Sequence, residues 1–480
     1  MLPKKIRRVH FIGIGGSGMS GIALVAREHG MEVSGSDLKE SRYMRSLLRV
    51  GVPVTVGHDA ANVADPTIDV VVASTAIPEK NVEYQAAIKQ GFEPWQRARM
   101  LAFLGHGYQT LAVAGTHGKT TTSSMLATTL DRLGADPTFL IGGVVDGYDS
   151  TARAGKGQHF VVEADESDGS FTWLDPALAI VTNIEADHLD HYADLDEIYA
   201  AFAAFFEKLT PTGTLVVCNE NPRLTALAQA SGRTVCTYGL DDTAHVRCEP
   251  RTGDDVRDFA VIFADGERCS LHLGASPGIH NMLNATAIMA TLDILGFDRT
   301  RSATALSAFS GVRRRFDEIG SAAGVTVVDD YGHHPTELAA TLKAARGLGY
   351  GRVHVLFQPH RYTRTQALLA DFARAFDSAD TVSFMDIYPA GEVPIPGVTG
   401  EALVAAVAAH NSAANVRLIR HRLEVAEAMA DAAQPGDLII TMGAGDVTVL
   451  APLIVEALER REQQGRGQQR EQQEHGDVGV

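Results

Sequence analysis

The chain has few cysteines, few aromatic residues and no long apolar run. Its 480 residues include four cysteines, Cys218, Cys236, Cys248 and Cys269, and no Cys-x-x-Cys pair. Without that spacing a zinc ribbon or a dithiol redox centre is excluded, and reduced, mostly buried thiols are predicted. No apolar run reaches the ~20 residues that span a bilayer, so we expect no membrane insertion.

The chain also lacks an excess of positive charge. Its formal net charge of −17 argues against nucleic acid as a partner. An acidic protein that binds anions must concentrate its cations locally, which draws attention to Arg313–Arg315. The basic start, Met1–Lys5, lacks the apolar core and cleavage site of a signal peptide, so we expect a cytoplasmic protein.

Short apolar runs alternate with helical patterns along most of the chain. This alternation predicts an α/β protein with mostly parallel, doubly wound sheets. A chain of this length is too long for one core, and we expect three domains. The expected boundaries are 1–106, 107–310 and 311–459. Residues 460–480 are rich in Gln, Glu, Arg and Gly and are predicted to be a disordered tail.

The most specific motif is a glycine-rich loop, Gly115–Thr122, between the apolar run Leu111–Ala114 and a helical stretch. A strand, a tight turn and a helix N-terminus present backbone N–H groups to phosphate. Lys119 adds a cation for the outer phosphates, and Thr120 a hydroxyl suited to Mg²⁺. Val113 replaces the first glycine of the usual P-loop pattern, and an ordinary glycine-rich helix start is the alternative. The candidate ATP-binding residues are Gly115, Thr116, His117, Gly118, Lys119, Thr120 and Thr121.

A second glycine loop follows the first apolar strand and fits the pattern G-x-G-x-x-G. An acidic residue, Asp37, follows the next strand, where a ribose ligand is expected. The pattern alone fits NAD, another pyrophosphate, or structural glycines without a ligand. Because no hydride-transfer site is recognisable, two glycine loops favour two nucleotides, ATP and a substrate carrying a nucleoside diphosphate. The candidate substrate-binding residues are Gly13, Gly15, Gly16, Ser17, Gly18 and Asp37.

Two acidic segments follow apolar strands of the expected middle domain. Glu163 ends the first of these strands, and His188 lies in the acidic loop after the second. Beside a phosphate loop, such carboxylates can bind Mg²⁺, and a neutral imidazole can coordinate a second divalent ion. A polar loop and a structural histidine are the alternatives.

A third polar group opens a helix with His280, Asn281 and Asn284. His280 and Asn284 share a helix face. An asparagine amide can read an adenine edge or can cap the helix, and the spacing favours neither.

Together these motifs resemble the Mur ligase superfamily, and within it the alanine-adding branch. The resemblance runs from about Val9 to Leu453. Besides the motifs above it includes the segments Arg313–Asp317, Asp329–Glu337 and Gln358–Thr365. The Asp-Asp-Tyr-Gly-His-His-Pro-Thr-Glu and Gln-Pro-His-Arg-Tyr-Thr-Arg-Thr strings carry the similarity to the alanine-adding branch.

The resemblance implies a Rossmann-like UDP-binding domain, a central P-loop-type ATPase domain and a C-terminal Rossmann-like domain that binds the amino acid. It implies ATP-dependent ligation of L-alanine to the lactyl carboxylate of UDP-N-acetylmuramate, with Mg²⁺ at two sites. We expect a monomer or a weak homodimer.

The resemblance also assigns roles to single residues. Lys119 and Thr120 match the phosphate and first Mg²⁺ contacts, and Glu163 and His188 match the second Mg²⁺ site. His280, Asn281 and Asn284 match the adenine side. The residues expected to act from the third domain are Arg315 and Asp330 on the nucleotide, and His333, His360, Arg361 and Arg364 on the acceptor carboxylate and alanine.

One position departs from several sister ligases, which carry a carbamylated lysine after the Asp-His-Leu-Asp motif. Phe202 lies at or near that position here, so no carbamate is expected. The rival interpretations are a recycling ligase that joins a whole tripeptide to the same sugar nucleotide, an NAD-dependent oxidoreductase, and a non-catalytic ATP-regulated binding protein.

Overall fold

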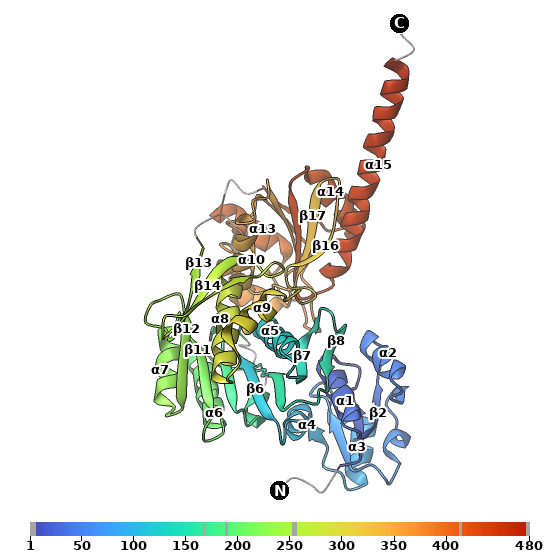
Figure 1. Cartoon of the computed structure of the whole chain (residues 1–480). Coiled ribbons are helices and arrows are strands. Elements are labelled where there is room, and N and C mark those ends of the chain that lie inside the picture. The colour runs from blue at the N-terminus through green and yellow to red at the C-terminus, as the bar shows by residue number, and fades with distance from the viewer. Residues whose placement is uncertain (1–5, 168, 188–190, 252–256, 412–414, 477–480) are drawn as a thin grey trace. The chain divides into compact units, whose positions relative to one another are not determined.

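The computed structural model of the chain contains three β-sheets, each flanked by helices (Figure 1). It describes residues 6–167, 169–187, 191–251, 257–411 and 415–476. The expected α/β architecture with mostly parallel sheets is confirmed. None of the described helices is long and apolar enough to cross a membrane.

The first sheet is parallel throughout and has the strand order β3-β2-β1-β4-β5. This order matches the first five strands of the Rossmann order 3-2-1-4-5-6. Its strands are β1 (Arg8–Ile12), β2 (Glu32–Asp37), β3 (Val54–Val56), β4 (Val70–Ala73) and β5 (Trp95–Gln96). Its helices are α1 (Ser17–Glu28), α2 (Arg42–Arg49), α3 (Val82–Lys89) and α4 (Arg97–Leu104), with the 3-10 turn η1 (Ala60–Val63).

The second sheet has ten strands in the order β15-β14-β13-β12-β11-β10-β6-β9-β7-β8. Pairing is parallel from β13 through β7, and β8 joins β7 antiparallel. The strands are β6 (Gln109–Ala114), β7 (Thr138–Val145), β8 (Ser150–Arg153), β9 (His159–Glu163), β10 (Leu178–Val181), β11 (Thr214–Cys218), β12 (Thr234–Gly239), β13 (Val246–Pro250), β14 (Asp258–Phe263) and β15 (Arg268–His272). The helical elements are α5 (Lys119–Arg132), η2 (Ser170–Trp173), α6 (Leu195–Glu207), α7 (Pro222–Ala230), α8 (Ile279–Ile294) and α9 (Arg299–Ser307).

The third sheet has the order β16-β17-β21-β18-β19-β20, parallel except for the β16–β17 hairpin. Its strands are β16 (Asp317–Ala322), β17 (Val325–Asp330), β18 (Val353–Phe357), β19 (Thr381–Phe384), β20 (Asn415–Leu418) and β21 (Leu438–Met442). Its helical elements are α10 (Pro335–Arg346), α11 (Tyr362–Ala367), α12 (Leu369–Phe372), α13 (Gly400–His410), α14 (Arg422–Ala432), η3 (Val447–Val449) and α15 (Leu450–Gly476).

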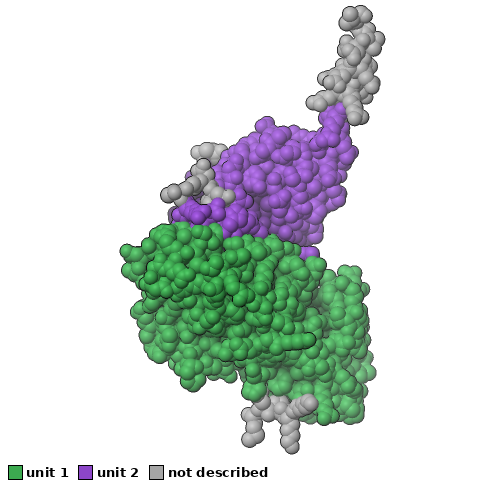
Figure 2. Space-filling model, viewed as in Figure 1, with its two compact units in different colours: residues 1–249, 260–271, 283–310 green, residues 250–259, 272–282, 311–480 purple. Residues whose placement is uncertain are grey.

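The chain forms two compact units (Figure 2). The first contains residues 1–249, 260–271 and 283–310, and therefore both the first sheet and most of the second. The second contains residues 250–259, 272–282 and 311–480. The division passes through α8, between Met282 and Leu283.

The first two sheets share a core because α1 packs on the β7–β8 hairpin. Gly21 makes this close approach possible, since a Cβ there would lie 3.3 Å from Ala152 Cβ and 3.6 Å from Leu140 Cγ. Leu140, Ala152 and Phe160 accordingly belong to the same buried cluster as the residues of α1. The two glycine loops are thus held within one unit.

Residues 460–476 of the predicted disordered tail are helical in the structure, and residues 477–480 lie outside the described residues. Helix α15 continues to Gly476 (Figure 1). Gln, Glu and Arg are good helix formers, and Arg466 pairs with Glu462 one turn earlier. The composition that lacks apolar residues for a core therefore still permits a helix.

A buried carboxylate network lies in the first domain. Glu83, at the start of α3, is fully buried and is hydrogen-bonded to His10, Ser36, His58 and Asn62. Burial alone would raise the pKa of Glu83, but the hydrogen bonds from His10, Asn62 and Ser36 outweigh it and hold the pKa below its usual range.

Replacing Glu83→Gln should destabilise the protein by roughly 1–3 kcal/mol at neutral pH. A lowered pKa gives stability that is present above the unfolded-state pKa, roughly 4.3, and is lost as the pH falls through the folded-state value. The stability gap between wild type and variant should therefore persist at neutral pH and shrink only below the unfolded-state pKa, as measured by urea unfolding from pH 7 down to about pH 2. The exposed Glu79→Gln is the control, and a gap that does not change with pH would contradict the assignment.

Candidate active site

The phosphate loop leaves the end of β6 and enters α5, as expected. Helix α5 begins at Lys119, its N-cap residue is Gly118, and no side chain caps it. Its first backbone N–H groups and its dipole therefore face the loop. Gly118 has φ +84°, and a Cβ there would lie 3.2 Å from Oδ1 of Asn284. The loop thus takes the form that phosphate binding requires.

The neighbouring strand end fixes the loop. Asn183, after β10, accepts the His117 N–H at 2.8 Å through its side chain and the Thr116 N–H at 3.0 Å through its carbonyl. Thr182 donates to the His117 carbonyl, and the Thr116 hydroxyl accepts the Glu185 N–H at 2.9 Å. The loop backbone is therefore held independently of any ligand.

Lys119 lies at the centre of this loop. Its ammonium contacts the carbonyls of Gly115 and Thr116 and, at 2.8 Å, the Oε1 of Glu166. Burial would lower the pKa of Lys119, but Glu166 and Asp165 outweigh it and keep the pKa above its usual value. Burial raises the pKa of Glu166, and the Lys119 ammonium opposes this rise by stabilising the carboxylate.

Thr120 and Glu163, expected at the first and the second Mg²⁺ site, contact each other in the structure. The Thr120 hydroxyl lies 3.0 Å from both carboxylate oxygens of Glu163, and the Gly142 N–H donates to Glu163 Oε2 at 2.7 Å. A hydroxyl and a carboxylate beside a phosphate loop are the oxygen donors that Mg²⁺ prefers. The donor set thus fits a magnesium ion.

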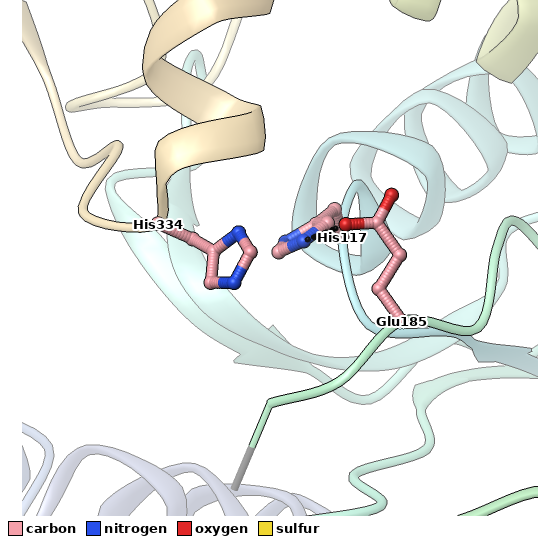
Figure 3. Close-up of side chains that lie close together, drawn as sticks. All are labelled: His117, Glu185 and His334. Atoms are coloured by element: carbon pink, nitrogen blue, oxygen red, sulfur yellow. Dashed lines mark ion pairs between the residues drawn. The ribbon is translucent and has the colours of Figure 1, made fainter. Parts of the chain in front are cut away.

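The second acidic loop approaches the phosphate loop through Glu185. Its carboxylate lies 3.4 Å from Nε2 of His117, and the two side chains point toward each other (Figure 3). His188, the predicted ligand of a second Mg²⁺, lies outside the described residues.

Thr121, in the first turn of α5, is buried.

The first glycine loop joins β1 to α1, whose N-cap residue Gly16 provides no side-chain cap. Asp37, at the end of β2, accepts the Gly15 N–H at 2.8 Å. A Cβ on Gly15 would lie 2.8 Å from the same carboxylate oxygen, so this contact requires glycine. The structure therefore places Asp37 against the loop that includes Gly13, Ser17 and Gly18.

A cavity of about 170 Å³ is lined both by this loop and by the segment at the end of β9. Its lining includes Ser17 and Gly18 from the loop, Glu163 and Asp165 from that segment, and Arg97. The Arg97 guanidinium is 3.7 Å from Asp165, and its Nη1 is 2.8 Å from an ideal Cβ on Gly18. The volume is below the ~300–1,000 Å³ of whole-ligand pockets, so it suits part of a larger ligand.

In the second unit, Arg315 lies in a strained turn. Its neighbours Arg314 and Phe316 have φ of +64° and +53°, which are uncommon for residues with a Cβ. Arg314 anchors the turn by donating to the Gly443 carbonyl at 2.7 Å, whereas Arg315 lies 3.7 Å from Glu337. Of these two arginines, Arg315 is therefore the better candidate for a ligand contact.

Asp330 ends β17 beside this turn. It accepts the N–H groups of Phe316 at 2.8 Å and Gly332 at 2.7 Å. Burial raises the pKa of Asp330 to about 6. The carboxylate thus fixes the backbone on both sides of its own strand end.

The residues expected to meet the amino acid gather in the second unit. The His333 and His360 rings are 6.1 Å apart, Arg364 lies 3.4 Å from His360, and Arg361 lies 3.9 Å from Glu392. Burial and the neighbouring arginines lower the pKa of His360 to about 4. His360 is therefore neutral at pH 7.

The third polar group is divided by the structure. His280 and Asn281 belong to the second unit and contact each other, whereas Asn284 belongs to the first and approaches Gly118. Both asparagines lie inside α8, which begins at Ile279, so neither is its N-cap.

Sequence reasoning missed three contacts. It did not predict the ion pair of Glu166 with Lys119 or the hydrogen bond that Asn183 accepts from the phosphate loop. It also did not predict the stacking of the Tyr388 ring on His360, with ring centroids 5.6 Å apart. All three follow strand ends on the carboxyl side, which is the one signal that would have found them.

Comparison with known proteins identifies the class. Three family models match the chain. Residues 8–109 match the catalytic domain of the Mur ligase family. Residues 113–292 match the Mur ligase middle domain, and residues 314–445 match the glutamate ligase domain of Mur ligases. The chain therefore belongs to the Mur ligase family.

Its relatives narrow the similarity within that family. It is 46% identical over 463 residues to the UDP-N-acetylmuramate–L-alanine ligase of Acidothermus cellulolyticus, covering 95% of this chain and 96% of that protein. The crystal structure of UDP-N-acetylmuramate–alanine ligase from Thermotoga maritima matches with a TM-score of 0.77 and 28% identity over 96% of this chain and all of that one. A murein peptide ligase from Psychrobacter arcticus matches with a TM-score of 0.69 and 26% identity, covering 94% and 99%.

Gly118→Ala should weaken ATP binding by roughly tenfold, because it adds a Cβ against Asn284 at the helix N-terminus. Calorimetric titration with ATP measures this. Gly134→Ala is the matched control, since Gly134 has φ +83° and nothing within 4 Å of its ideal Cβ. In both variants the free energy of unfolding should fall by roughly 1–2 kcal/mol, because alanine is unfavourable in the left-handed conformation of these two glycines. Equal ATP affinity in the two would contradict the loop assignment.

Proposed function

We propose that the chain ligates L-alanine to the lactyl carboxylate of UDP-N-acetylmuramate, using ATP and releasing ADP and phosphate. The product is UDP-N-acetylmuramoyl-L-alanine, a peptidoglycan precursor. The Mur ligase family membership and the relatives named for this reaction support the proposal over an oxidoreductase or a binding protein. We further propose a cytoplasmic enzyme that acts as a monomer or a weak homodimer.

The chemistry requires activation of a carboxylate, which is a poor acylating agent. A lactyl carboxylate oxygen attacks the γ-phosphorus of ATP, the bond to the ADP oxygen breaks, and an acyl phosphate forms. The alanine amine then attacks the acyl carbon, and phosphate leaves with the bridging oxygen. Positioning and charge neutralisation supply most of the rate enhancement.

One observation carries the proposal: a single cavity joins the first glycine loop to Glu163 and Asp165. Glu163 in turn is hydrogen-bonded to Thr120 of the phosphate loop. A sugar nucleotide held at Gly13, Gly15, Gly16, Ser17, Gly18 and Asp37 can thus extend its far end toward the γ-phosphate of ATP at Lys119.

Two Mg²⁺ ions, one held by Thr120 and one by Glu163 with His188, would neutralise the phosphate charge when bound. Gly115, Thr116, His117, Gly118 and Thr121 provide the backbone and turn around the phosphates. His280, Asn281 and Asn284 are proposed to contact the adenine side.

The second unit is proposed to supply the remaining groups. Arg315 is suited to stabilise the transferring phosphoryl group, and Asp330 fixes the backbone that presents it. His333, His360, Arg361 and Arg364 are proposed to bind the carboxylate of alanine. A neutral His360 can donate a hydrogen bond to the alanine carboxylate, whereas its lowered pKa makes it a weak base for the ammonium.

L-alanine should support phosphate release from ATP and UDP-N-acetylmuramate, whereas the tripeptide of a recycling ligase should not. The measurement is phosphate release with each acceptor amine at equal concentration. A higher kcat/KM for the tripeptide would replace the proposal with the recycling alternative.

Lys119→Ala should reduce the rate of alanine-dependent phosphate release on the order of 100- to 1,000-fold, because the positive charge that stabilises the phosphates in the transition state is lost. The exposed Lys89→Ala is the control and should retain the wild-type rate. Substantial turnover by the Lys119 variant would refute the phosphate-loop assignment.

A further inference from the structure

The ammonium of Lys119 uses all three of its donors within the protein. It lies 2.6 Å from the Gly115 carbonyl, 3.1 Å from the Thr116 carbonyl and 2.8 Å from Glu166 Oε1. A lysine ammonium has three N–H donors and no acceptor. To contact a phosphate oxygen, Lys119 must therefore give up one of these bonds.

Glu166 is the partner that can be exchanged. The two carbonyls belong to the loop backbone, which Asn183 and Thr182 hold in place. Glu166 contacts Lys119 through a side chain on the segment after β9, a separate part of the chain. Its departure leaves the loop conformation unchanged.

The Lys119–Glu166 contact is a buried ion pair. The side chain of Glu166 is 2% exposed and that of Lys119 12% exposed. Charges in such surroundings attract each other more strongly than on the surface, and either one is costly to leave uncompensated. The carboxylate thus occupies the place, in charge and in hydrogen bonding, that a phosphate oxygen would take.

We propose that Glu166 is a positioning residue that neutralises Lys119 until ATP displaces it. The inference rests on the proposed function, because it takes ATP as the ligand of the phosphate loop. Binding then exchanges one anionic partner of Lys119 for another. A ligand with several phosphates compensates for the lost pair through further backbone contacts, whereas a single inorganic phosphate has fewer contacts to offer. Displacing Glu166 lowers the affinity of both ligands, and only the polyphosphate has enough other contacts to retain tight binding.

The test is the variant Glu166→Gln in the full-length chain. Glutamine keeps the size and an acceptor oxygen but removes the competing charge. ATP should bind roughly tenfold more tightly, the factor expected when a competing charge-assisted hydrogen bond is weakened. Inorganic phosphate should gain affinity as well. Calorimetric titration with ATP and, separately, with phosphate measures both.

A gain in affinity separates positioning from a merely structural role. The nucleotide-free variant should melt at a lower temperature because Lys119 loses its ionic partner, while the ATP-induced rise in Tm should exceed that of wild type. Glu207→Gln, exposed at the end of α6, is the matched control and should change neither affinity. Unchanged or weaker ATP binding by Glu166→Gln overturns the inference.

Two further results keep the test decisive. If Glu166→Gln does not fold, Glu166→Asp replaces it, because aspartate withdraws the carboxylate by one methylene. This variant should also bind ATP more tightly than wild type, by a smaller factor. ATP binding that is no tighter overturns the inference. If wild type binds no ATP, or binds it independently of Lys119, the proposed function itself fails. If ATP binding depends on Lys119 but the Glu166 variants bind ATP no more tightly than wild type, the inference fails and the proposed function stands.

Discussion

The active site depends on one buried cation. Lys119 is held by two loop carbonyls and by Glu166, and the loop itself is tied to the end of β10 through Asn183. A buried ammonium is stable only where anionic partners surround it. Glu163, Asp165 and Glu166, all at or after the end of β9, meet this requirement because β9 lies next to β6 in the sheet. The parallel pairing of two strands thus brings the cation and its carboxylates together.

The second constraint is the close packing of α1 on the β7–β8 hairpin. Gly21 lets the helix approach Ala152, and the cores of the first two sheets merge at this contact. The glycine loop at the start of α1 therefore lies near the carboxyl end of β9, and one cavity reaches both. A ligase that activates a carboxylate needs this proximity between its acceptor and its phosphate donor. The packing of a single helix supplies it.

Much of this architecture could be predicted from the sequence. The strand–loop–helix around Lys119 is a local motif, and the structure has it. The sequence placed Thr120, Glu163 and Asp37 beside glycine loops or at strand ends, but it did not predict the contact of Thr120 with Glu163 or that of Asp37 with Gly15. The family resemblance was confirmed by the comparisons. The strand patterns also predicted the parallel sheets, because buried parallel strands appear as continuous apolar runs.

The rest depended on contacts between distant segments or on competing preferences. The roles of Glu166 and Tyr388 arise only when separate loops meet, which spacing along the chain does not encode. Residues 460–476, where composition predicted disorder, continue helix α15, whose first turns pack in the core through Leu450, Ile454 and Leu458. Phe202, expected only to replace a lysine, is fully buried and packs edge-on against Phe171. Phe202 thus belongs to the hydrophobic core of the second sheet.

The most direct test of the account is the fate of the acceptor's carboxylate oxygens. UDP-N-acetylmuramate labelled with heavy oxygen in the lactyl carboxylate would be turned over with ATP and L-alanine, and the phosphate released would be analysed by mass spectrometry. Activation of the carboxylate at the Lys119 loop predicts one labelled oxygen in each phosphate and one retained in the amide. Unlabelled phosphate would show that ATP cleavage does not pass through the carboxylate, and would contradict the account.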